Sequence, residues 1–115
     1  MNGICHIEIP SVNLDRVSKF YGTVFGWESN YVKEMDYSMW KAPQGVNGGF
    51  SKQLKAAPKD SGVLFYIEVT DIEVSLKNIE ISGGKMVRAK TSIPGIGHFA
   101  IFKDTEENDI GLFSA

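Results

Sequence analysis

Two histidines and a few glutamates are the side chains of this 115-residue chain best suited to acid–base or metal chemistry. Apolar and polar residues alternate over residues 4–9, which puts His6 and Glu8 on one face of a predicted strand. Glu68 occupies the position of Glu8 in a second predicted strand of similar sequence. If Glu8 and Glu68 share a pocket, one carboxyl group can act as an acid and the other as a base. The alternative is a structural role, in which each pairs with a lysine or a backbone donor.

His6 and His98 are the two imidazoles of the chain. One interpretation joins both in a metal site, with His98 at the start of a strand near the mouth of a cleft. Nothing in the sequence brings the two together, however. The other interpretation is a hydrogen-bonded histidine that closes one end of the core.

Aromatic residues supply a possible apolar lining for an organic ligand, although at least half of them are expected in the core. Cys5 is expected on the helix-facing side of the first strand, as an inert small hydrophobic residue. The predicted ligand-binding residues are His6, Glu8, Trp40, Tyr66, Glu68, His98 and Phe113.

These residues lie in two similar segments, each a strand followed by a capped helix. In the first, Asn13 is the expected N-cap and Gly26 the stop; in the second, Asp71 caps the helix and Gly83 follows it. Three strands are expected after each helix. The expected strands are residues 4–9, 28–32, 37–41 and 49–52 in the first half, and 63–69, 85–90, 98–103 and 109–113 in the second.

The pattern predicts an α+β fold with two βαβββ modules that form one curved mixed sheet, a half-open barrel with both helices outside. The whole chain, 1–115, is expected to be a single domain. Module one covers about 1–52 and module two about 63–115. Residues 53–62, polar and broken by proline and glycine, read as the linker. A cleft between the modules is the expected ligand site.

Charge and composition exclude several classes of partner. The net charge is −2, with no basic face for nucleic acid. The sequence contains no recognisable signal peptide or apolar run long enough to span a bilayer. A single cysteine excludes an internal disulfide and multi-cysteine metal sites, so a cytoplasmic protein is expected.

Several motifs resemble the vicinal oxygen chelate superfamily, which includes glyoxalases, bleomycin and fosfomycin resistance proteins and extradiol dioxygenases. The resemblance covers the whole chain. Within the superfamily, the chain most resembles the small, single-domain glyoxalase-like branch. It rests on the His6 strand followed by Phe20-Tyr21 and Val24-Phe25-Gly26-Trp27, on Gly83-Gly84-Lys85, and on Phe102-Lys103-Asp104 with Asn108-Asp109-Ile110-Gly111-Leu112.

This resemblance implies metal-ligand positions on the first and last strands of the modules. His6 occupies one of them, and its counterpart in module two falls on or near Leu64, or on Tyr66. The expected carboxylate falls on Gly111, and its counterpart in module one falls near Gly48 or Gly49. One imidazole alone would hold a divalent ion weakly. No cofactor is therefore expected; if any metal binds, His6 is the ligand.

The function expected from these observations is metal-independent binding of a small hydrophobic or aromatic molecule, without nucleic-acid or membrane partners. The alternative is a divalent-metal-dependent lyase, isomerase or dioxygenase that uses His6. A third possibility is a structural module with a vestigial cleft. The resemblance also implies a homodimer.

Overall fold

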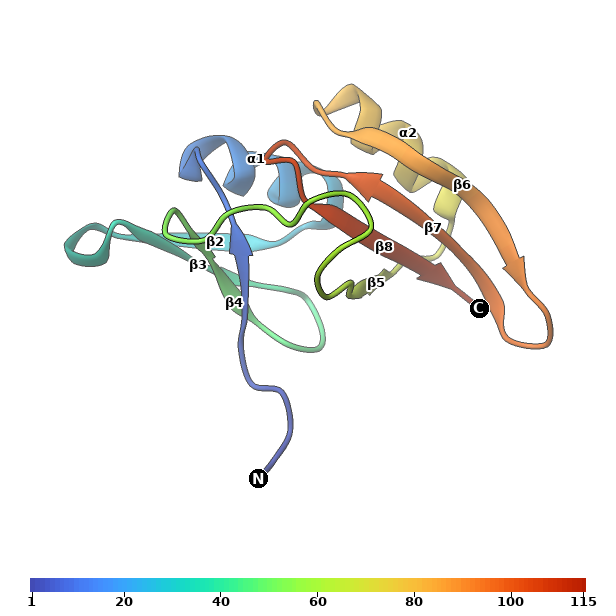
Figure 1. Ribbon diagram of the computed structural model, residues 1–115, viewed down its shortest axis with the longest axis horizontal. Coiled ribbons are helices and arrows are strands. Elements are labelled where there is room, and N and C mark those ends of the chain that lie inside the picture. Colours follow the sequence, from blue (N-terminus) through green and yellow to red (C-terminus); the bar gives the residue numbers. More distant parts are fainter. The chain divides into compact units, whose positions relative to one another are not determined.

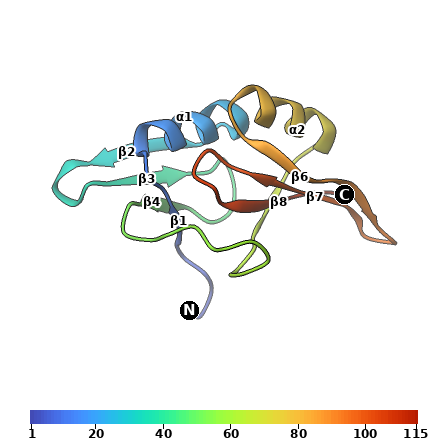
Figure 2. The same cartoon turned by 45° about the horizontal axis from the view of Figure 1, so that its top comes forward.

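The computed structural model describes residues 1–115, which form two compact units. Module one spans Met1–Ala56 and module two spans Ala57–Ala115. Each module contains one α-helix and one four-stranded mixed sheet. In both modules the helix lies along one face of its sheet (Figures 1 and 2).

Module one consists of β1 (Ile7–Pro10), α1 (Leu14–Phe25), β2 (Glu28–Val32), a short 3-10 turn (Lys33–Met35), β3 (Tyr37–Lys41) and β4 (Gly48–Ser51). The strand order is β1-β4-β3-β2. β1 runs parallel to β4, whereas the other neighbouring strands are antiparallel.

Helix α1 begins and ends where its sequence predicts. The side chain of Asn13 accepts a hydrogen bond from the Arg16 backbone N–H at 3.0 Å, which satisfies a donor left free at the first turn. Gly26 has a φ of 74°, a left-handed conformation that glycine adopts without a steric penalty. The buried side chains of α1 are Leu14, Val17, Phe20 and Tyr21.

An aromatic cluster fills the space between α1 and its sheet. Trp27 stacks between Tyr21, at 4.6 Å between ring centroids, and Trp40, at 4.1 Å. Phe50 completes the cluster from β4. All four side chains are buried, and rings of this size supply much of the apolar area of a small core.

Module two consists of β5 (Tyr66–Glu68), α2 (Ile72–Ile81), β6 (Lys85–Ile93), β7 (Gly97–Lys103) and β8 (Asp109–Ser114), in the order β5-β8-β7-β6. The Asp71 side chain caps α2 by accepting from the Val74 N–H at 3.1 Å. Asp104 shapes the turn before β8, because its carboxylate accepts from the backbone N–H groups of Glu106 and Asn108 at 2.8 and 3.0 Å. Neither helix of the chain has the length and apolar composition needed to cross a membrane.

The structure confirms the predicted α+β fold with two βαβββ modules. The predicted bounds of β2 and β3 match, those of β4, β7 and β8 are off by no more than one residue at either end, and three strands differ by more. β1 begins at Ile7, because β4 offers partners only from Gly48 on, so Cys5 precedes the strand and is exposed rather than packed against the helix. β5 is shorter than predicted, because it pairs with only three residues of β8. β6 continues to Ile93 rather than ending at residue 90, because β7 pairs with it up to the turn, so residues 91–93 belong to a hairpin.

Candidate functional site

A polar cluster lies on the face of the module-one sheet that α1 does not cover. Glu8 alternates with the buried Ile9 on β1 and is exposed, with Gly49 of β4 as its cross-strand partner. Tyr37 of β3 reaches this face from the other side of β4. The hydroxyl of Tyr37 lies 2.7 Å from Nε2 of His6, and the two rings are nearly parallel, at 18°. His6, Glu8 and Tyr37 therefore form one connected group.

The environment of Tyr37 keeps its hydroxyl neutral. Partial burial, a hydrogen bond to the Glu8 carboxylate and the negative charge of Glu8, in that order, raise the pKa of Tyr37 to about 12. A phenol with this pKa stays protonated throughout the physiological range. It can donate one hydrogen bond and accept others.

A tyrosine ring covers a glycine in each module. At Gly49, an added Cβ would collide with the hydroxyl and ring of Tyr37; at Gly111 of β8, it would collide with the ring of Tyr66 from β5. These glycines lie at or beside the positions where the family resemblance implies a carboxylate. Their missing side chains leave the space that the two tyrosine rings occupy.

The pairing of β1 with β4 and of β5 with β8 shows which residues correspond. Gly49 pairs with Glu8, and Gly111 pairs with Tyr66, on the helix-free face in both cases. With Gly49 and Gly111 superposed, the counterpart of His6 is Leu64. Of the two predicted alternatives, Leu64 and Tyr66, the register favours Leu64.

The helix-free face of module two is aromatic. Tyr66, Phe99 and Phe113 lie together on it, since Tyr66 meets Phe99 edge-on at 6.4 Å and Phe99 pairs with Phe113 across β7 and β8. The Arg88 guanidinium of β6 lies over the Phe99 ring, 4.9 Å from its centroid. Glu68 borders the group as the cross-strand partner of Phe113.

Five of the seven predicted site residues lie on these two helix-free faces, and two, Trp40 and His98, do not. Module one brings His6 and Glu8 together, and module two brings Tyr66, Glu68 and Phe113 onto one face. Trp40 is only 3% exposed; it lies on the helix side, in the core, where its Nε1–H donates to the Gly49 carbonyl at 3.0 Å. His98 pairs with Ser114 and alternates with Phe99, so it faces away from the aromatic face.

Three residues of these faces were not among the predicted site residues: Tyr37, Phe99 and Arg88. Strand alternation, which is visible in the sequence, separates Tyr37 from Trp40 and places it on the face of Glu8. The same alternation along β7 and β8 places Phe99 with Phe113. The sequence does not predict that Arg88 lies on this face, because its direction depends on two register shifts in β6.

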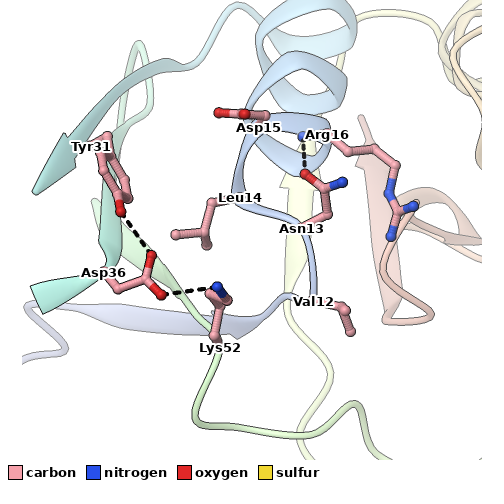
Figure 3. Close-up of a pocket in the computed structure, with 8 residues that line it drawn as sticks. All are labelled: Val12, Asn13, Leu14, Asp15, Arg16, Tyr31, Asp36 and Lys52. Carbon is pink, nitrogen blue, oxygen red and sulfur yellow. Dashed lines mark hydrogen bonds and ion pairs between the residues drawn. The ribbon is translucent and has the colours of Figure 1, made fainter. Parts of the chain in front are cut away.

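A separate open cavity of about 570 Å³ lies in module one, beside the start of α1 (Figure 3). Its clearest feature is a network at Asp36, which accepts from Tyr31 Oη and from Lys52 Nζ, both at 2.9 Å. The hydrogen bonds from Lys52 and Tyr31 lower the pKa of Asp36, and its carboxylate raises the pKa of both partners. None of the predicted site residues lines this cavity, whose lining residues are Val12, Asn13, Leu14, Asp15, Arg16, Tyr31, Asp36 and Lys52.

The donor set does not fit the divalent metal that the family resemblance implies. A metal site of that kind needs several imidazole or carboxylate ligands, but the chain has no group of three His, Cys, Asp or Glu side chains arranged to hold an ion. His6 Nε2 is also engaged by Tyr37, and glycine stands at the carboxylate positions.

Comparison with known proteins gives one clear relative in sequence. A protein of Didymella fabae described as a "Glyoxylase-like domain-containing protein" is 31% identical over 113 residues, which covers 91% of this chain and 88% of the relative. No protein-family profile matches the chain.

Solved structures agree on the fold. The fosfomycin resistance protein FosX of Listeria monocytogenes, complexed with Mn(II) and sulfate, superposes with a TM-score of 0.81 at 14% identity, over 100% of this chain and 91% of that one. A mutant glyoxalase I of Zea mays gives 0.71 at 19% identity, over 96% of this chain and 45% of that one. At these identities the likeness shows the fold alone.

Proposed function

From the premise that the chain belongs to the glyoxalase-like family of the vicinal oxygen chelate superfamily, we propose that it binds a small hydrophobic or aromatic molecule without a metal ion. Each module, taken by itself, offers a helix-free sheet face on which such a ligand packs: the face with His6, Glu8 and Tyr37 in module one, and the face with Tyr66, Phe99 and Phe113 in module two. Their exposure supports this placement: Tyr66 is 48% exposed, and His6 and Glu8 are exposed.

One observation carries the proposal: in each module a tyrosine ring covers a glycine that lies at or beside the position where the resemblance implies a carboxylate. A carboxylate at Gly49 or Gly111 would need the space that Tyr37 or Tyr66 occupies. The substitution removes a hard oxygen ligand and adds an aromatic surface in the same place. Both changes favour an organic ligand over a metal ion.

The aromatic face of module two supports a planar ligand. Rings pack well against other rings in edge-on or offset arrangements, which contribute about 0.5–1.5 kcal/mol beyond the buried area. Phe99 receives such a contact from Tyr66 and also lies beneath Arg88. A planar ligand on this face would add further aromatic contacts of the same kind.

The first experiment is native mass spectrometry with elemental analysis, on protein purified without chelators or added metal. We expect less than one-tenth of an equivalent of divalent metal per chain. One tightly bound ion per chain that is lost in His6→Ala would instead support the rival metal-dependent lyase, isomerase or dioxygenase.

The second experiment measures binding of 2-methoxynaphthalene, a neutral aromatic probe, by isothermal titration calorimetry. Phe99→Ala is expected to weaken binding on module two about tenfold, since it removes the ring on which the stack is built. Ile81→Ala is the control, because Ile81 is equally apolar and 75% exposed but lies at the end of α2. Equal losses in both variants would contradict the assigned face.

Homodimer formation and a cytoplasmic location stay predictions from the sequence. Sedimentation velocity at micromolar concentration tests the dimer. A single species with the mass of one chain, 12.7 kDa, would contradict it.

A further inference from the structure

A cation without a carboxylate partner lies at the aromatic face of module two. Arg88 of β6 is exposed, and its guanidinium lies over the ring of Phe99, with 4.9 Å between its central carbon and the ring centroid. Lys103 of the neighbouring strand, in contrast, pairs with Asp109 at 2.9 Å. Arg88 forms no ion pair within the chain, so its positive charge is available to a ligand.

The Arg88 guanidinium is contacted on two sides. Its Nε–H donates to the Thr91 hydroxyl oxygen at 3.4 Å, and that hydroxyl donates in turn to the Ala89 carbonyl at 2.8 Å. The Phe99 ring packs against the group in a cation–π contact. The two terminal nitrogens, Nη1 and Nη2, form no hydrogen bond with the protein. Their N–H groups therefore remain as free donors beside the aromatic rings.

The chemistry of these donors favours one kind of acidic group. A guanidinium recognises a planar carboxylate through two parallel hydrogen bonds, because the spacing of its N–H groups matches that of the two carboxylate oxygens. A neutral aromatic ligand would leave the Nη donors of Arg88 to solvent. An aromatic carboxylate would pair with both of them while its ring packs on the neighbouring rings.

The strand register places two opposite charges at the two edges of this face. Two rows of cross-strand partners run from β5 to β6: Glu68, Phe113, Phe99 and Thr91 in one, and Tyr66, Gly111, Ile101 and Arg88 in the other. Arg88 and Glu68 are thus separated by three strand spacings, about 14 Å. Because Glu68 repels an anion at the β5 edge, both charges direct the acidic group of a ligand toward Arg88.

We propose that the helix-free face of module two selects aromatic ligands that carry a carboxylate group. The ring packs on Tyr66, Phe99 and Phe113, and the carboxylate accepts hydrogen bonds from the Nη groups of Arg88. This inference rests on the proposed function and names the ligand class for one of its faces. The three rings supply the apolar contact, and Arg88 supplies the selectivity.

Module two also contains a matched control for the charge of Arg88. Lys90 lies two residues further along β6, is exposed and carries the same charge, but its Nζ lies 3.9 Å from Glu73 of α2. Its charge is therefore directed to the helix side of the sheet. Arg88→Gln and Lys90→Gln change the net charge equally, and only the first removes donors from the aromatic face.

The test uses two probes of nearly equal size, 2-naphthoate and the neutral 2-methoxynaphthalene, titrated calorimetrically into the full chain at about pH 7, where an ordinary carboxyl group is ionised. We expect 2-naphthoate to bind about fivefold more tightly, a ratio at the upper end for a solvent-exposed charge pair. The net charge of the chain is −2, so overall attraction would not produce a preference for the anion.

Arg88→Gln is expected to reduce this preference to less than twofold, and Lys90→Gln to leave it unchanged. Arg88→Lys keeps the charge but lacks the planar fork, so the preference should fall to about twofold. In parallel, the Nε–H signal of Arg88 in a ¹H–¹⁵N spectrum, identified by its absence in Arg88→Gln, should move further with 2-naphthoate than with 2-methoxynaphthalene.

Three results would overturn the inference. If both probes bind equally to the wild type, ligand binding stands but selection by Arg88 is refuted. If Lys90→Gln lowers the preference as much as Arg88→Gln does, the preference depends on net charge and not on this face. If neither probe binds, the proposed function itself fails, and this inference fails with it.

Discussion

Two glycines show how single residues shape the helix-free faces. Gly49 and Gly111 lack a side chain where the family resemblance implies a carboxylate, and tyrosine rings from other strands lie over them. The consequence is chemical as well as steric, since Tyr37 then reaches both His6 and Glu8. At this scale, the neighbours of an absent side chain determine which groups the surface presents.

Gly48, one residue before Gly49, provides a stability test on the opposite face. A Cβ there would collide with the backbone carbonyl of Ile7 and would lie within 2.8 Å of the indole of Trp40, which is buried. Gly48→Ala is expected to lower the free energy of unfolding by about 1–3 kcal/mol, as overpacking does in cores. Urea denaturation measures the change.

Gly3→Ala is the matched control, because nothing lies within 4 Å of the Cβ that it adds. Its unfolding midpoint should equal that of the wild type. Equal midpoints for Gly48→Ala and the wild type would show that β1 and Trp40 shift to accommodate the added methyl group at little cost in stability.

The ionisation of Tyr37 gives a second residue-scale prediction. The pKa of Tyr37 is raised to about 12 in the folded chain, whereas an unfolded tyrosine titrates near 10. The folded state therefore favours the neutral phenol. The resulting stabilisation is complete below about pH 10 and is lost as the pH rises toward about 12.

Phenolate absorbance measured against pH follows this ionisation when the Tyr37→Phe curve is subtracted, since the chain has four tyrosines. Glu8→Gln should lower the pKa of Tyr37 only in part, since burial is the larger cause and the carboxylate the smaller one. Glu28→Gln, an exposed change at the far edge of the same sheet, should leave it unaltered. A Tyr37 pKa of about 10 in the wild type would contradict the described cluster.

At the scale of elements, the capping residues fix where both helices begin. Asn13 and Asp71 each accept a hydrogen bond from the backbone N–H three residues ahead. Asn13→Ala and Asp71→Ala are each expected to lower the free energy of unfolding by about 1 kcal/mol. Asn13→Asp keeps an oxygen acceptor and should retain most of the stability, which thermal unfolding can measure.

Sequence reasoning succeeds where a signal is local. Asn13, Gly26 and Asp71 predict the helix bounds because each acts within a few residues of itself. The β2 and β3 strands match for the same reason, since turn residues flank both. Strand ends depend on a distant partner, and this explains the errors at β1, β5 and β6.

The site was harder to predict, because its contacts join distant segments. Thirty-one positions separate His6 from Tyr37, and no local pattern shows that they meet. Sequence similarity alone also does not give the facing of a strand: residues 48–52 and 111–115 are similar, yet Phe50 faces α1 while Phe113 faces the helix-free side. A shift of one residue reverses every side chain of a strand.

At the scale of the whole molecule, the segment between the modules is the expected point of cleavage. Residues 52–65 form neither helix nor strand, and Lys55 and Lys59 are exposed there. Proteases cut preferentially at such segments. Brief trypsin treatment should first cut after Lys55 or Lys59, as judged by fragment masses.

Lys77 is the comparison site, since it is exposed but lies within α2. Cleavage there should follow cleavage in the linker. Early cleavage after Lys77 would show that α2 opens more readily than the connecting segment.

The stacked indoles described in module one also determine how this chain can be observed. Both tryptophans of the protein, Trp27 and Trp40, are buried there, and module two has none. Intrinsic tryptophan emission therefore monitors one half of the molecule, whereas far-ultraviolet circular dichroism registers both helices and both sheets. If module two unfolded first, a melting curve recorded by emission alone would still count the protein as folded.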